Sequence, residues 1–121
     1  MERYDYLESV KKDVREWINE HAINITPENR EEWESELNER LFCEDSVTGN
    51  SSGSYTCNAW QAEENLCHNI DLLSEALAEF GCGLEYITEN GVEACDVSIR
   101  CYLLPQAISK VLDEMEEEEE E

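Results

Sequence analysis

Cysteine and histidine are the residue types in this chain that could carry metal or nucleophilic chemistry. They are Cys43, Cys57, Cys67, Cys82, Cys95, Cys101, His21 and His68. Structural zinc sites usually take ligands in close pairs such as Cys-x-x-Cys, and no such pair occurs here. Cys67 and His68 are neighbours, but adjacent helical residues point about 100° apart. We therefore expect no metal, no cofactor and no catalytic residue.

Two other chemical hypotheses stay open. A cysteine and a histidine distant in the sequence could meet as a nucleophilic pair, as in most chains that hold both types. His68 could also hold a divalent cation loosely together with Glu64, Asp71 and Glu75. The simpler consequence of that cluster is a raised affinity for protons.

Acidity is the strongest feature of the composition. The chain has 31 acidic residues against 8 basic ones, a formal net charge of −23, and no lysine or arginine between Leu41 and Ile99. Nucleic acid and anionic membrane would be repelled, so both are excluded as direct ligands. This balance favours a basic protein partner.

Length and composition predict one helical domain over residues 1–115 and an acidic, disordered tail over 116–121. The N-terminus lacks the basic segment and apolar run of a secretory signal, and no apolar stretch is long enough to span a bilayer. We therefore expect a cytoplasmic protein with reduced thiols.

Apolar periodicity predicts about four helices and an all-α fold. The first covers about residues 4–20, on the stripe Leu7, Val10, Val14, Trp17 and His21. The second follows Thr26 as N-cap and Pro27 as first helical residue, and runs to Phe42. The third has the stripe Leu66, Ile70, Leu73, Leu77 and Phe80.

The last helix is predicted over about 92–114. Its apolar register, Val97, Cys101, Leu104, Ile108, Val111 and Met115, continues through Pro105 and indicates a kinked helix. The alternative is an α+β fold with a short strand near 96–103, because Val97, Ile99 and Cys101 also alternate. Residues 83–91 are predicted as a turn-rich connection.

Residues 47–55 are rich in Gly, Ser and Asn and predict a long loop. A phosphate cradle would need a Gly-Lys-Ser/Thr ending, which is absent. The loop is better interpreted as a connection or a partner contact, with Asn50, Ser52 and Tyr55 as the contacting residues.

Carboxylates at helical spacing are the predicted partner-binding residues. One row is Glu28, Glu32, Glu36 and Glu39, and a second is Glu64, Asp71, Glu75 and Glu79. Ordinary exposed helices mix signs to gain favourable pairs, and these rows do not. Trp33, Trp60 or Tyr55 could add aromatic anchors.

The segments 46–56 and 60–69 resemble a family of small acidic proteins encoded by phages and mobile elements of gut Firmicutes. The resemblance covers most of the chain, from Tyr4 to about Glu114. It implies a mobile-element origin and brings no catalytic or binding residues with it. The wider class contains anti-CRISPR and anti-restriction inhibitors, several of which are DNA mimics.

These observations predict an acidic, DNA-mimic-like inhibitor that binds the basic nucleic-acid-binding surface of a host defence nuclease, a Cas effector or a restriction enzyme, in the bacterial cytoplasm. One alternative is an acidic antitoxin or adaptor that binds a basic protein without imitating DNA. A second alternative is a small enzyme acting on a defence component. A third is that the acidity serves only to keep the protein soluble. A homodimer is also compatible with the narrow apolar stripes.

Overall fold

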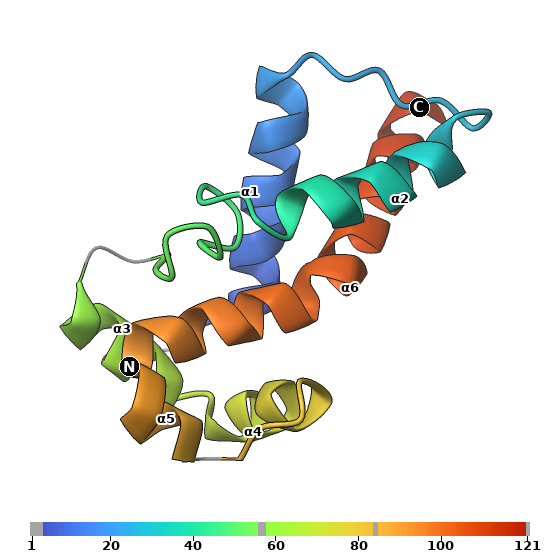
Figure 1. The fold of residues 1–121 in the computed structure, drawn as a ribbon. Helices are drawn as coiled ribbons and strands as arrows, with labels where there is room; N and C mark the ends of the chain where they lie inside the picture. Colours follow the sequence, from blue (N-terminus) through green and yellow to red (C-terminus); the bar gives the residue numbers. More distant parts are fainter. Residues whose placement is uncertain (1–3, 56–57, 84, 121) are drawn as a thin grey trace.

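The computed structural model describes residues 4–55, 58–83 and 85–120, and these form six α-helices and no strand (Figure 1). The helices are α1 (Tyr6–Glu20), α2 (Arg30–Leu41), α3 (Ala59–Cys67), α4 (Ile70–Glu79), α5 (Glu85–Asn90) and α6 (Val92–Glu120). The all-α prediction is confirmed. The alternative strand near 96–103 is wrong, because those residues lie inside α6.

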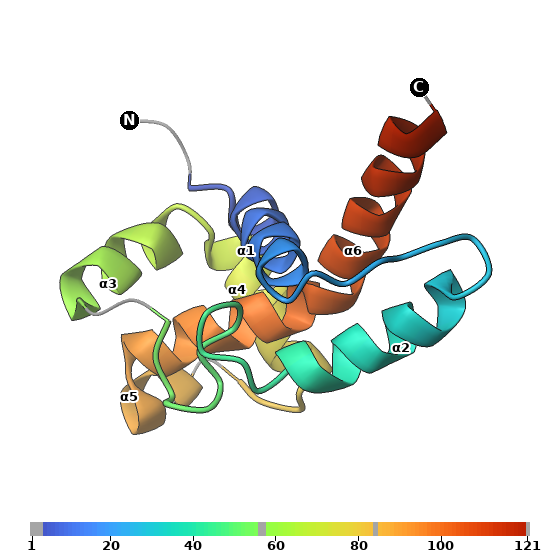
Figure 2. The same cartoon turned by 90° about the horizontal axis from the view of Figure 1, so that it is seen from above.

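Helix α6 is the element on which the fold is built, since it packs against each of the other five helices. It continues through Pro105, as the apolar register predicted. Proline lacks a backbone N–H and its ring crowds the carbonyl four residues earlier, so it bends the helix. Figures 1 and 2 show the two halves of α6 running in different directions.

The apolar core has two parts, one on each half of α6. The first lies between α1, α2 and the C-terminal half of α6, around Val14, Leu41 and Ile108. The second lies between α3, α4, α5 and the N-terminal half, around Leu77 and Ile99. Helices α3, α4 and α5 therefore pack on the N-terminal half of α6 and α2 packs on the C-terminal half, whereas α1 contacts both halves, with Tyr6 in the second part of the core.

The single third helix predicted from the heptad stripe is wrong, because the chain breaks between α3 and α4. Asn69 Nδ2 donates to the carbonyl oxygen of Asn65 at 2.9 Å. In a continuous helix that carbonyl would accept the Asn69 backbone N–H, which instead bonds to Leu66 O at 2.9 Å. A side chain thus replaces a helical backbone bond and ends α3.

The break changes what the predicted stripe buries. Leu66, Leu73 and Leu77 are buried, but Ile70 and Phe80 are 49% and 45% exposed. Asn69 also donates to Tyr4 O at 2.9 Å, which ties the break to the segment before α1.

Three further predictions of local structure are corrected. Helix α2 begins three residues later than predicted, with Asn29 as N-cap, although Thr26 Oγ1 still accepts the Asn29 N–H at 3.3 Å. The predicted turn over 83–91 contains α5. The predicted disordered tail is helical from Glu116 to Glu120, because Arg30 and Arg15 pair with Glu116 and Glu118 and offset the repulsion; residue 121 lies outside the described residues.

Arg100 is fully buried on α6 and joins three parts of the chain. Its Nη2 donates to Asp13 Oδ2 at 2.6 Å and its Nη1 to Ser9 Oγ at 2.9 Å, both on α1. Its Nε donates to the Val47 carbonyl at 2.7 Å, in the loop. The Tyr55 ring lies 3.5 Å from the guanidinium carbon, and the Tyr55 hydroxyl donates to Asp13.

Burial dominates the electrostatics of this cluster. It raises the pKa of Asp13 even though the Arg100 charge lowers it. It also raises the pKa of Tyr55 to about 12, with the hydrogen bond to Asp13 acting in the same direction. Tyr55 therefore stays a neutral donor at physiological pH.

Asp96 is a second buried acid on α6. Tyr6 donates its hydroxyl hydrogen to Asp96 Oδ1, while Oδ2 has no hydrogen-bond partner among the described residues. Burial raises the pKa of Asp96 and also that of Tyr6. The ionised form of Asp96 thus opposes folding.

Arg100→Met is expected to lower the free energy of unfolding by about 3–5 kcal/mol, because the Asp13 carboxylate and the Val47 carbonyl lose their buried donor. Adding Asp13→Asn should recover part of that loss, since the uncompensated charge is gone. Urea unfolding followed by circular dichroism measures both. If the two single losses simply add in the double variant, the pair is not coupled.

Asp96→Asn is expected to raise Tm by several degrees at about pH 8, equivalent to about 1 kcal/mol. The folded pKa of Asp96 lies above its unfolded value, so its contribution to stability is present at low pH and is lost as pH rises through the folded pKa. Between about pH 5 and about pH 8, the free energy of unfolding should therefore fall less for the variant than for the wild type. Glu16→Gln, an exposed site, is the control and should leave this slope unchanged. Equal slopes for wild type and Asp96→Asn would contradict the assignment.

Candidate partner-binding surface

Basic residues are confined to one part of the described structure. Apart from the buried Arg100, they lie on α1, α2 and the C-terminal half of α6: Lys11, Lys12, Arg15, Arg30, Arg40 and Lys110. Lys11 Nζ lies 2.5 Å from Glu114 Oε2, and Arg15 Nη1 lies 3.0 Å from Glu118 Oε2. The hydrogen bond between Lys11 and Glu114 raises the pKa of the lysine and lowers that of the carboxyl.

Arg30 makes the corresponding contacts from α2. Its Nη2 lies 2.7 Å from Asp113 Oδ1 and its Nη1 lies 2.7 Å from Glu116 Oε2. These pairs raise the pKa of Arg30, the bond to Asp113 contributing most. The acids at the end of α6 thus pair with three of the eight basic residues of the chain.

The acids of α4 have no such compensation. Asp71, Glu75 and Glu79 are exposed, recur at steps of four, and form no ion pair within the described part of the chain. Their helix packs on the N-terminal half of α6, in the stretch of sequence that has no lysine or arginine. These three members of the second predicted row therefore present an uncompensated anionic face.

Glu64 does not extend that face as predicted. It lies on α3, on the other side of the break at Asn69, and is half-buried. His68 is the C-cap of α3 and is exposed. Among the described residues no three His, Cys, Asp or Glu side chains come together to hold a metal ion.

The first predicted row lies on and just before α2, which packs on the C-terminal half of α6. Glu28 precedes α2, and Glu32 and Glu39 are exposed on it. Glu36 is neutralised by Arg40, whose Nε lies 2.5 Å from Glu36 Oε1. The two rows lie on helices that pack on different halves of α6, and the α4 row is the more uniformly negative.

The loop before α3 is held by its own hydrogen bonds. Ser52 is exposed, with its N–H donating to Asp45 Oδ1 at 2.9 Å. Gly49 has φ +79°, and a Cβ there would lie 2.6 Å from the backbone of Ser54, so only glycine fits. Tyr55 is half-buried and contacts Asp13 and Arg100, and its predicted role as a partner contact stays a prediction.

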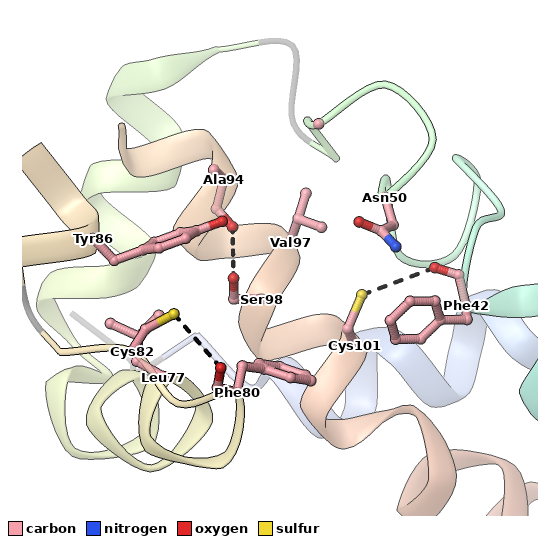
Figure 3. Close-up of a pocket in the computed structure, with 11 residues that line it drawn as sticks. Phe42, Asn50, Leu77, Phe80, Cys82, Tyr86, Ala94, Val97, Ser98 and Cys101 are labelled. Atoms are coloured by element: carbon pink, nitrogen blue, oxygen red, sulfur yellow. Dashed lines mark hydrogen bonds between the residues drawn. The ribbon is translucent and has the colours of Figure 1, made fainter. Parts of the chain in front are cut away.

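Sequence reasoning missed an apolar groove beside α6. A hollow of about 200 Å³ is lined by Leu77, Val97 and Cys101 and flanked by Phe42 and Phe80 (Figure 3). Phe42 comes from the end of α2 and Phe80 from the end of α4, so two segments distant in sequence meet across α6. The only available signal was an aromatic residue at the end of each helix.

The groove continues past this hollow. A second hollow of about 290 Å³ shares Phe42, Phe80 and Cys101 with the first and adds Glu79 and Pro105. Asn50, the third predicted loop contact, lies on its first part. Glu79 therefore belongs both to the α4 row and to the groove.

The two tryptophans predicted as aromatic anchors differ in exposure. Trp33 is half-buried against the first part of the core, whereas Trp60 at the start of α3 is 68% exposed. None of the described helices is both long enough and apolar enough to cross a membrane.

Cys101 is expected to resist alkylation although it lines the groove. Burial raises the pKa of its thiol to about 11, so on the order of one molecule in a thousand carries the thiolate at about pH 8. Iodoacetamide followed by mass spectrometry should modify the exposed Cys43 and Cys67 about 100-fold faster than Cys101. Equal rates at the three thiols would contradict this picture of the groove floor.

Comparison with known protein families, with curated proteins and with solved structures finds no match for this chain.

Proposed function

We propose that this protein is an acidic inhibitor that binds the basic nucleic-acid-binding surface of a host defence nuclease, such as a Cas effector or a restriction enzyme, in competition with DNA. The observation that carries the proposal is the uneven distribution of charge. Three cations, Lys11, Arg15 and Arg30, pair with acids at the end of α6, while the α4 acids Asp71, Glu75 and Glu79 are exposed without a partner in the described structure.

The spacing of the α4 acids supports imitation of a DNA strand. Asp71 and Glu79 are eight residues apart, which is about 12 Å along a helix axis. One strand of duplex DNA presents a charge about every 3.4 Å, so about three or four phosphates fall in that length. Three carboxylates on a rigid helix supply a similar density of charge.

The energetics also favour binding to a basic surface. Like-charged side chains four residues apart destabilise a helix by about 0.2–0.5 kcal/mol per pair. Lysine and arginine of a partner would relieve that repulsion on binding. Long-range attraction would raise the association rate and would weaken as salt shortens the screening length to about 10 Å at 0.1 M.

An acidic adaptor or antitoxin that binds a basic protein without replacing DNA is the second candidate. The groove between Phe42 and Phe80 favours it, because an apolar contact has no counterpart in a DNA-mimicking face. Displacement by DNA separates the two candidates, since only a mimic shares its binding site with nucleic acid.

The triple variant Asp71→Asn, Glu75→Gln, Glu79→Gln is expected to lose the partner. Tagged protein is used to capture proteins from a bacterial lysate at low salt, with and without added duplex DNA. The wild type should retain a nucleic-acid-binding protein that DNA displaces. The amount of this protein that the triple variant retains should be lower by about tenfold or more.

The matched control is Glu16→Gln, Glu20→Gln, Glu117→Gln, three exposed acids on α1 and the end of α6. It changes the net charge by the same amount on another face, so it should bind as the wild type does. Equal losses in both variants would mean that net charge alone matters. Inhibition that is complete at far below one molecule per target would point to an enzyme and would contradict the proposal.

A further inference from the structure

We propose that the groove flanked by Phe42 and Phe80 binds an amphipathic helix of the partner protein, with apolar residues on one face and lysine or arginine beside them. The inference rests on the proposed function in one respect, that the partner is a basic protein. It adds a second contact, made by apolar side chains, to the contact made by the α4 acids.

The dimensions of the groove fit a helix better than a small molecule. Each of its two hollows, about 200 Å³ and about 290 Å³, is by itself smaller than the usual site for a small ligand, about 300–1,000 Å³. The two neighbouring hollows share Phe42, Phe80 and Cys101, and their lining extends along α6 from Ala94 to Pro105, which is about 16 Å at the helical rise per residue. Three apolar anchors of a bound helix, at i, i+4 and i+7, span about 10 Å and so fit within this length.

The two aromatic rims are exposed and held in place. Phe42 and Phe80 are 41% and 45% exposed. The carbonyl of Phe42 accepts hydrogen bonds from Thr48 Oγ1 at 3.0 Å and Cys101 Sγ at 3.9 Å. The carbonyl of Phe80 accepts one from Cys82 Sγ at 3.7 Å. Figure 3 draws the bonds from Cys101 and Cys82. A rim whose backbone is already ordered loses less entropy on binding than a flexible one.

The Phe80 rim is also fixed by the end of its helix. Gly81 has φ +76°, and the Cys82 N–H bonds back to Leu77 O at 2.7 Å. This is the hydrogen bond of a Schellman-type helix ending, which sets the direction of the chain after Phe80.

Charge selects the occupant. Glu79 lies on the groove, none of the described residues that line either hollow is a lysine or arginine, and Asp71 and Glu75 continue from Glu79 along α4. A partner helix with lysine or arginine beside its apolar face would place those cations against these acids. A second copy of this chain is disfavoured, because it brings a net charge of −23 to a surface that is already negative.

The test uses a synthetic helical peptide of about 18 residues, with leucine at i, i+4 and i+7 and lysine at the flanking positions, and a second peptide with glutamate in place of lysine. Calorimetry gives the affinity, and amide chemical shifts of the ¹⁵N-labelled full chain locate the site. The lysine peptide should bind and shift Val97, Ser98 and Cys101, and the glutamate peptide should not.

The variant Phe42→Ser, Phe80→Ser is expected to weaken the lysine peptide about tenfold or more, since it removes the apolar rims. Both residues are exposed, so folding should persist, and circular dichroism checks this. Trp60→Ser is the matched control, an exposed aromatic residue on α3 that does not line the groove, and it should bind as the wild type does.

Four outcomes would overturn the groove: no binding of the lysine peptide, equal binding of the glutamate peptide, unchanged affinity in the double variant, or a dimer of the chain that buries Phe42 and Phe80. The result also separates this inference from the proposed function. Peptide binding that the double variant loses, together with a captured partner that DNA does not displace, would keep the groove and reject DNA competition. A captured partner that is displaced by DNA, but is still retained by the Phe42→Ser, Phe80→Ser variant, would keep DNA competition and reject the groove.

Discussion

The Arg100 guanidinium lies in the interior of the protein, where a charge is tolerated only if its hydrogen bonds and its opposite charge are supplied. Asp13 and Ser9 of α1, and the Val47 carbonyl of the loop, supply them. Arg100 thereby holds α1, the loop and α6 in fixed positions relative to one another. Because the loop joins α2 to α3, this coupling also fixes the chain that follows Phe42 on one side of the groove.

Helix α6 separates the molecule into two regions of different electrostatic character. Its C-terminal acids pair with Lys11, Arg15 and Arg30, so repulsion within the acidic end is offset and the end is helical. Helices α3, α4 and α5, on its N-terminal half, contain no lysine or arginine, and their acids form no ion pair within the described part of the chain. A chain of net charge −23 thus uses three of its eight cations to hold the end of α6 and leaves the α4 face negative.

The groove and the α4 acids meet at Glu79, so the proposed apolar and electrostatic contacts are adjacent rather than alternative. Charge on a flexible surface would attract many basic proteins with little discrimination. Apolar side chains that must fit between two ordered rims add a requirement of shape. In this proposal the acids bring a basic partner to the surface and the groove selects among such partners.

By itself the sequence determined the helical class, the burial of Val10, Val14 and Trp17 in α1 and the course of α6 through Pro105, because each follows from periodicity within one segment. It also determined the acidity and the absence of cations over half of the chain. It did not determine the end of the α1 stripe, where His21 is exposed. Only the tertiary structure decided that Asn69 interrupts the third helix, that Arg100 is buried and that Phe42 meets Phe80 across α6. These depend on side chains and carbonyls far apart in the sequence, such as Tyr4 for Asn69 and Val47 for Arg100, and a local pattern contains no information about which distant groups will be in reach.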